Sequence, residues 1–320
     1  MKTKRLTRTA LATALAASML TIALPPPAFA TAPDRNGLIA FWAQTGAGEQ
    51  LFTVHPNGHG MRQITHVNGD AAHPHWSPDG SRLVFELDTP DSGNLAFINA
   101  DGSGLVQIPA AAHGFEGQPT FTPDGNRVVF ERYDAVTNDD AIWSMKLDGT
   151  DRVRVVSGPA GASAPSVSPD GQTLSFVSFD GNEFGQALAT SRLDGSQQHQ
   201  LTPFALDVAV KQDWAPDGQH LVLSDNADIA EQSANLATIR PDGTELTYLT
   251  HFTDGTTRAY AGSYSPDGQW IVYRLEQGGE YALMRMRPDG SDKHTILPFS
   301  DFRPRAIDWG SRVTSQGSGS

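Results

Sequence analysis

One tetrapeptide recurs along this chain at nearly constant spacing. The letters SPDG end at Gly80, and close variants end at Gly125, Gly171, Gly218 and Gly268, so that their aspartates are separated by 45, 46, 47 and 50 residues. A period of this length with β-type patterning is the signature of a β-propeller, in which each repeat forms a four-stranded blade. The repeat therefore restricts the chain to a circular array of small sheets.

Each copy has the composition of a tight turn between two strands. Ser or Thr at the first position can bond its hydroxyl to the backbone ahead, Pro presets φ at the second, and Gly accepts a positive φ at the fourth. A short β-rich run follows, such as Leu83–Phe85 after the first copy. A second turn, at Gly102 in this repeat, comes about 23 residues later, with a strand before it and an apolar residue after it. Four strands per repeat are thereby accounted for.

The two ends of the chain complete the ring. Residues 36–41 match the second strand of a repeat, but no first strand precedes them. Residues 306–309 match that missing first strand. We therefore predict an all-β fold: a six-bladed β-propeller over residues 31–313, with four antiparallel strands per blade and the C-terminal strand completing the first blade. Closure removes exposed sheet edges, and Trp309 should be buried at the seam.

These repeats resemble the TolB-type β-propeller family. Blades of that family carry the patterns NADGSG, WSPDG and IAF, and this chain has NADGSG at residues 99–104 and WSPDG at residues 76–80. The similarity runs from about Asn36 to Trp309, so it covers the propeller part only, without the α/β domain that precedes it in TolB. Related repeats also form the non-catalytic half of certain serine peptidases and the body of some polysaccharide lyases. The resemblance implies a fold and leaves both binding and catalysis open.

The first thirty residues have the features of a secretory signal peptide. A basic start is followed by an apolar run from Ala10 to Leu24, three prolines and an A-x-A cleavage pattern ending at Ala30. This run of 15 residues is shorter than the roughly 20 that a membrane span needs. We therefore predict cleavage of residues 1–30 and export by the Sec route to the periplasm, the cell envelope or the outside. The Ser-Gly-rich residues 314–320 are expected to be a disordered tail.

Charge limits the partners of this chain. Removing the leader takes away four positive charges and no negative ones, so the net charge moves from −13 to −17. Nucleic acid is not an expected partner, because phosphate binding needs clustered Lys and Arg. The chain contains no cysteine, so no disulfide can staple the fold. We expect a monomer held together by a large apolar core.

Variable loops should gather at one end of the propeller, because both turns of every repeat lie at the other end. Recognition is expected at the loop end. Acidic residues in these loops indicate either a rim for a basic peptide, amine or cation, or ordinary solvation of an acidic exported protein. None has the regular spacing of a calcium-binding loop. The acids predicted to bind a ligand are Asp134, Asp139, Asp140, Asp225 and Asp228.

A second candidate site lies on the innermost strands. The residue before the aromatic position of the repeat is polar in all six blades: His75, Thr120, Ser166, Asp213, Ser263 and Asp308. If these side chains face the central channel, His75, Asp213 and Asp308 could hold Ca²⁺ or another divalent metal ion. His73 could contribute to the same site or bind a ligand there. The alternative is a polar ring that binds ordered water.

Trp42 breaks the pattern of its repeat position. The other blades carry Glu86, Glu131, Val177, Ser224 and Arg274 there. Trp42 is therefore either an exposed aromatic beside a binding loop or a residue of the packed core.

Catalytic motifs are scarce. The chain has no G-x-S-x-G elbow, no H-E-x-x-H and no P-loop. We predict a non-catalytic binding module for a protein, peptide or glycan. The alternative is a metal-assisted lyase or hydrolase that acts on a polysaccharide or lactone at the mouth of the channel.

Overall fold

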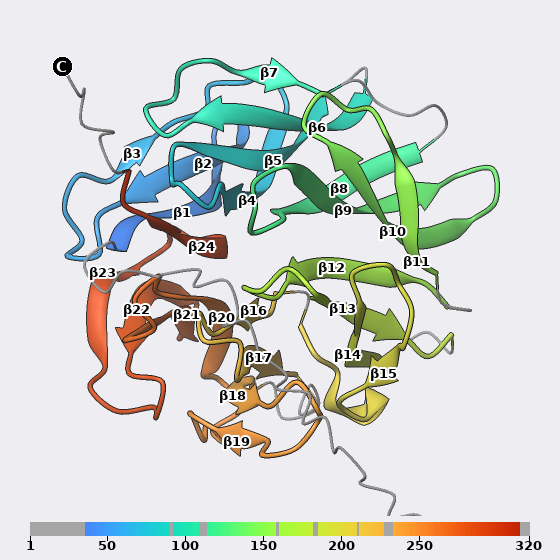
Figure 1. The fold of residues 1–320 in the computed structure, drawn as a ribbon. Helices are drawn as coiled ribbons and strands as arrows, with labels where there is room; N and C mark the ends of the chain where they lie inside the picture. Colours follow the sequence, from blue (N-terminus) through green and yellow to red (C-terminus); the bar gives the residue numbers. More distant parts are fainter. Residues whose placement is uncertain are drawn as a thin grey trace, which may run out of the picture.

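Six antiparallel sheets surround a central channel (Figure 1). The predicted six-bladed propeller with four strands per blade is therefore confirmed. No helix in the part of the chain that the structure describes is long and apolar enough to cross a membrane. The predicted signal peptide, the predicted tail and Asp228 lie outside the described residues. The computed structural model describes residues 36–89, 92–108, 114–157, 160–181, 185–209, 211–226 and 233–313.

Each blade runs from an innermost strand at the channel to an outermost strand at the rim. In this order, blade 1 contains β24 (Arg305–Ser311), β1 (Asn36–Thr45), β2 (Gly48–Val54) and β3 (Arg62–Gln63). Blade 2 contains β4 (Asp70–Trp76), β5 (Arg82–Thr89), β6 (Ser92–Asn99) and β7 (Val106–Gln107). Blade 3 contains β8 (Gly114–Phe121), β9 (Arg127–Asp134), β10 (Asp139–Lys146) and β11 (Val153–Ser157). Blade 4 contains β12 (Ala162–Val167), β13 (Thr173–Phe179), β14 (Gln186–Arg192) and β15 (His199–Gln200). Blade 5 contains β16 (Asp213–Trp214), β17 (Leu221–Asp225), β18 (Asn235–Ile239) and β19 (Thr247–Tyr248). Blade 6 contains β20 (Arg258–Tyr264), β21 (Ile271–Gln277), β22 (Glu280–Met286) and β23 (His294–Ser300). A single 3-10 turn, η1 (Phe204–Leu206), follows β15.

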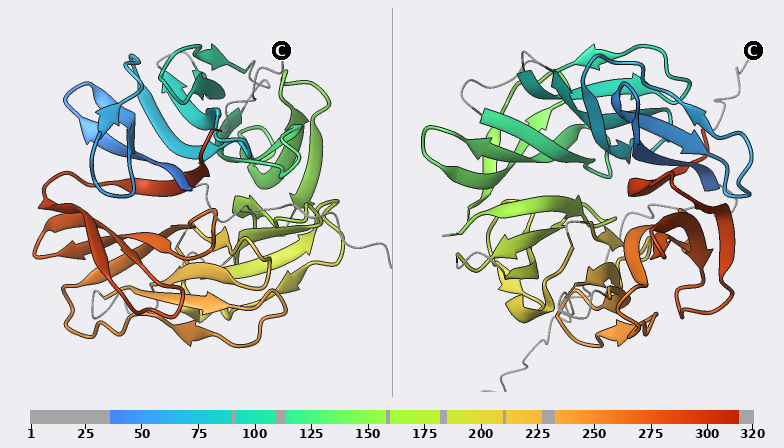
Figure 2. Two further views of the ribbon diagram at one scale, coloured as in Figure 1. Left: turned by 60° about the vertical axis from the view of Figure 1, so that its left-hand side comes forward. Right: turned by 180° about the vertical axis from the view of Figure 1, so that it is seen from behind.

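The ring closes in blade 1, where the two ends of the chain share one sheet. Strand β24 pairs antiparallel with β1, so that Trp309 lies opposite Ile39 and Asp308 lies opposite Ala40. Views from the front and from behind both show β24, in dark red, beside the blue β1 (Figures 1 and 2). Trp309 is only 5% exposed, as predicted for a seam residue.

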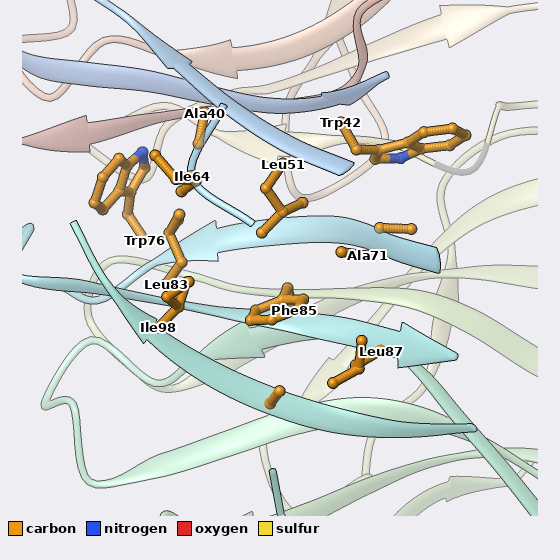
Figure 3. Close-up of a cluster of buried hydrophobic side chains, with 12 residues drawn as sticks. Ala40, Trp42, Leu51, Ile64, Ala71, Trp76, Leu83, Phe85, Leu87 and Ile98 are labelled. Carbon is orange, nitrogen blue, oxygen red and sulfur yellow. The ribbon is translucent and has the colours of Figure 1, made fainter. Parts of the chain in front are cut away.

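Apolar side chains fill the spaces between neighbouring blades. In the described part of the chain they form six clusters, one for each pair of adjacent blades. The cluster between blades 1 and 2 contains Trp42 at one end and Trp76 at the other, with Leu51 and Phe85 between them (Figure 3). Because each cluster needs two blades, the stability of the ring depends on its closure.

The repeated tetrapeptide forms the predicted turn. In the first copy, the Gly80 N–H donates to the Ser77 carbonyl at 2.8 Å, and Gly80 has a φ of 69°. The Ser77 hydroxyl accepts from the Arg82 N–H at 3.1 Å and donates to Asp79 at 2.6 Å. The other four copies close with the same backbone hydrogen bond. The turn between the first two strands is therefore nearly identical in the five blades that carry it.

Candidate functional site

A β-bulge interrupts the innermost strand of several blades and shapes the channel. Four bulge residues have a left-handed φ between 45° and 49°: His73, Gln118, Ala164 and Ala306. The pairing with the second strand shifts register at the same points. Proline follows three of these residues, at positions 74, 119 and 165, which a bulge on an edge strand tolerates because no ladder N–H is needed there. A bulge bends its strand and re-aims its side chains.

The bulges lie in the wall of a cavity of ≈ 520 Å³. Every blade contributes to this wall, mostly from the halves of its strands that lead into the variable loops. The cavity therefore belongs to the loop end of the propeller, where recognition was predicted. It brings together three of the predicted site residues, Trp42, His73 and His75.

The predicted polar ring links each blade to the next. An innermost strand has one unpaired edge, whose N–H groups need acceptors. Side chains of the ring supply them across three blade junctions: the Trp76 N–H donates to Asp308 at 2.8 Å, the Tyr264 N–H to Asp213 at 2.9 Å, and the Trp309 N–H to Ser263 at 2.7 Å. The ring thus has a structural role whether or not it also binds a ligand.

Burial shifts the pKa values of the titratable groups in the ring. Burial lowers the pKa of His75. Burial raises the pKa of Asp213 to about 7. Burial also acts to raise the pKa of Asp308, but His75, Lys211 and the Trp76 N–H lower it by more, so the net shift is downward. Lys211 lies 3.5 Å from ionised Asp308 and neutralises it.

The ring does not offer a ready set of metal ligands. In the described ranges, no three His, Asp or Glu side chains come together as a metal site requires. Asp213 and Asp308 already accept backbone hydrogen bonds, and His75 Nε2 lies 3.1 Å from the Thr120 hydroxyl. Ca²⁺ takes roughly six to eight oxygen ligands. A metal ion at His75, Asp213 and Asp308 therefore stays a prediction.

A second row of side chains connects neighbouring blades at the level of the bulges. It occupies the repeat position of Trp42, and four of its side chains bond to the next blade's backbone near the bulge. The Ala261 N–H donates to Ser224 at 2.7 Å, the Gln118 N–H donates to Glu86 at 3.4 Å, Arg274 donates to the Pro304 carbonyl at 3.1 Å, and Glu131 accepts from the Ala164 N–H. Residues of different chemistry thus perform one task, which explains why this position varies.

Trp42 is a residue of the packed core, one of the two alternatives predicted for it. It is 6% exposed and packs in the core between blades 1 and 2. It also lines the cavity, lies 6.0 Å from the His73 ring and stacks under Arg305 at 4.8 Å. Trp42 therefore joins the hydrophobic core to the cavity wall.

Glu131 makes stability depend on pH. Burial, followed by repulsion from Asp140 and Glu86, raises its pKa from 4.5 to about 8. Its Oε2 atom is buried without a partner in the described residues. Ionisation in the unfolded chain begins near pH 4.5, so the cost of burying Glu131 grows from there and levels off above pH 8. We expect Glu131→Gln, which keeps the acceptor for Ala164, to raise the free energy of unfolding on the order of 2 kcal/mol at pH 8.5 and to change it little at pH 5.

Denaturant titrations at the two pH values would measure this difference. The wild type and the variant differ by one proton-binding group and little in shape, so each pH serves as the control for the other. An equal shift at both pH values would contradict a protonated, buried Glu131.

Arginines dominate the mouth of the cavity. Arg274 and Arg303 both donate to Oε1 of Glu276 at 2.8 Å. Burial lowers the pKa of Arg274 to about 10 although Glu276 opposes the shift. Arg305 lies beside this cluster, and burial together with repulsion from Arg303 lowers its pKa. Two guanidinium groups therefore share one bridging carboxylate, and a third lies beside them.

Among the described residues, none of the predicted acidic ligand residues lines the cavity. Asp139 pairs with Arg154 at 2.5 Å, and Asp134 accepts hydrogen bonds from the backbone of the following turn. Asp225 accepts a hydrogen bond from the Tyr248 hydroxyl. A ligand-binding role stays a prediction for all five acids: Asp134, Asp139, Asp140, Asp225 and Asp228. Asp228 lies outside the described residues.

The basic lining was missed at the level of the sequence. Arg303, Arg305 and Lys211 stand three to six residues before an innermost-strand aromatic, two of them in the short motif RPR of an otherwise acidic chain. That local excess of positive charge was the available signal. The residue three places before the aromatic position lines the cavity in every blade, but its residue types share no pattern that would have indicated this: His73, Gln118, Ala164, Lys211, Ala261 and Ala306.

The structure is a closed propeller with one uniform end and one end that contains a cavity. Propellers of this kind serve, in general, as protein-interaction modules. Residues 95–312 match the family model described as the TolB beta propeller domain. The chain belongs to the TolB β-propeller family.

Three similar proteins illustrate this relationship. An uncharacterized protein of Agrobacterium fabrum is 30% identical over 102 residues, which span 31% of this chain and 33% of that protein. TolB from Acinetobacter baumannii has a TM-score of 0.71 at 18% identity, over 86% of this chain and 66% of that one. A chain of the nidogen/laminin complex has a TM-score of 0.66 at 14% identity, over 86% of this chain and 98% of that one. These two structures share the fold with this chain.

Proposed function

We propose that this protein is an exported, non-catalytic interaction module that holds a partner protein or peptide at the loop end of its propeller. One observation carries the proposal: the cavity at this end is lined by residues that differ in every blade, whereas the opposite end repeats one turn. Loops and walls that vary on a rigid scaffold are typical of recognition surfaces. A similar propeller occurs in a solved complex of two proteins, nidogen and laminin.

Export is the part of this proposal that rests on the sequence. Residues 1–30 combine a basic start, an apolar run and an A-x-A pattern, which are the features of a secretory leader. The sequence also left open a glycan ligand and a lyase or hydrolase activity. We do not extend the proposal to either of them, because no specific contact in the cavity favours a sugar or a reaction.

Site-specific photo-cross-linking would test the choice of face. A benzophenone amino acid at Ala47, exposed in the β1–β2 hairpin, samples the loop end; one at Lys293, exposed between β22 and β23, samples the turn end. We expect a discrete cross-linked partner from Ala47 and none from Lys293 when cells that export the protein are irradiated. Equal capture from both positions, or capture from Lys293 alone, would refute binding at the loop end.

A further inference from the structure

The cavity mouth has more positive charge than its own carboxylates neutralise. Glu276 accepts hydrogen bonds from both Arg274 and Arg303 through a single oxygen. Arg305 is half-buried and makes no hydrogen bond or ion pair with any described residue; Glu49 and Glu276 attract it only from beyond ion-pair distance. The cavity wall itself contains no Asp or Glu in the described residues. A half-buried guanidinium without a counter-charge is costly, so this arrangement is complementary to an incoming anion.

Aromatic rings hold these guanidinium groups in place. A stacked guanidinium keeps its N–H edge available for a planar, bidentate acceptor, which suits a carboxylate. The stacking also occupies the aromatic faces, which a sugar ring would otherwise use. Three pairs show this arrangement: Arg305 over Trp42 at 4.8 Å, Arg274 over Tyr260 at 4.4 Å and Arg303 over Tyr281 at 5.1 Å.

The remainder of the wall suits a peptide chain. Gln118, Gln212 and Ser166 lie with three prolines around the cavity, and a peptide backbone needs such a mixture of hydrogen-bonding and apolar contacts. Gln212 already donates to the Ala164 carbonyl at 2.7 Å, which fixes its position. A space of ≈ 520 Å³ can hold a few residues and is of the size usual for small ligand sites.

We propose that Arg305, assisted by Arg303, binds a carboxylate of a partner peptide in this cavity. The carboxylate comes from an Asp or Glu side chain or from a peptide C-terminus. This inference rests on the proposed interaction function and names the chemistry of its anchor. The expected ligand is thus acidic, although the protein itself is strongly acidic. At the mouth of the cavity, attraction by the local excess of arginine overrides the repulsion between the acidic ligand and the acidic protein.

Calorimetric titration with four probes would test this chemistry. Acetyl-Gly-Glu-Gly-amide carries a side-chain carboxylate, acetyl-Gly-Gly-Gly with a free C-terminus carries a terminal one, acetyl-Gly-Gln-Gly-amide is the neutral isostere, and digalacturonate is an acidic sugar. We expect saturable, salt-sensitive binding of one or both acidic peptides, at least about tenfold tighter than the neutral peptide. The two acidic peptides reveal which source of carboxylate is preferred.

Arg305→Gln should weaken the acidic peptide about tenfold or more. Arg287→Gln is the matched control, because Arg287 is also stacked on an aromatic ring, 3.9 Å from Trp270, but lies outside the cavity; it should leave binding unchanged. If Arg305→Gln does not fold, Arg305→Lys keeps the charge, loses the planar fork and should weaken binding several-fold.

Three results would overturn the inference: no binding of either acidic peptide, equal binding of the neutral peptide, or binding of digalacturonate in place of the peptides. Loss of affinity in Arg287→Gln equal to that in Arg305→Gln would also overturn it. If cross-linking from Ala47 persists in Arg305→Gln while the acidic peptides fail to bind, the carboxylate anchor is wrong and the interaction function stands. If that cross-linking is absent from the wild type, the interaction function itself fails.

Discussion

A chain shortened to end at Asp301 should melt at least about 10 °C below the full chain, or lose its cooperative transition. This truncation removes β24, which pairs with β1 and touches the innermost strands of both neighbouring blades. Ile307 and Trp309 leave a core cluster in which they are 2% and 5% exposed. Each such burial contributes roughly 1.5–3 kcal/mol, against a total stability of about 5–15 kcal/mol. Circular dichroism during a thermal scan would measure the change.

The matched control ends at Val313 and keeps the whole of β24. It should melt with the full chain. A synthetic peptide covering residues 302–313 should restore part of the lost melting temperature when it is added to the shortened chain, because it can pair with β1 again. A shortened chain that melts like the control would contradict the closed ring.

The architecture could be predicted because its information is local and repeated. Each turn carries Asp and Gly at the positions that its backbone requires, and five copies at a regular period specify the blades. The seam could be predicted for the same reason, since residues 306–309 match the first strand that the N-terminal segment lacks. The role of a repeat position can also be predicted from the sequence when that role is packing, as it is at Trp309.

The site was harder to predict because its parts come together only across blades. The residue before each aromatic is polar, and the sequence suggested ligands for a metal ion. In the structure Asp308 and Asp213 also satisfy N–H groups of the following blade, a role that the sequence did not indicate. Arg305 meets Trp42 because the chain ends share one sheet, and Arg303 reaches Glu276 of the preceding blade. No alignment of a single repeat contains these neighbours.

The bulges account for the rest of the difference. A left-handed residue such as His73 or Gln118 shifts the register of its strand, and a shift of one residue changes which side chains face the channel. The local signal is weak, because Gln and Ala have little preference for a positive φ. The position three residues before the aromatic therefore gave no warning that it would line the cavity.

Replacing Gly80 by Ala should be far more destabilising than the same replacement at Gly125. Both glycines end the same turn, with φ values of 69° and 68°, so Ala costs roughly 1–2 kcal/mol at each because of its backbone conformation. At Gly125 an added Cβ would meet only the Pro78 ring at 3.7 Å. At Gly80 it would lie 2.0 Å from the carbonyl oxygen of Ser311, the last residue of β24. We expect a loss of about 3 kcal/mol or more for Gly80→Ala, measured by denaturant titration.

The comparison between the two variants separates the turn from the seam. Strain in the turn is common to both, so the excess cost in Gly80→Ala reports how closely blade 2 packs against the strand that closes the ring. In the chain shortened to Asp301 the Ser311 carbonyl is absent, and the excess should disappear while the common cost remains. Equal destabilisation by Gly80→Ala and Gly125→Ala in the full chain would mean that the turn does not contact β24, and the packing at the seam would have to be revised.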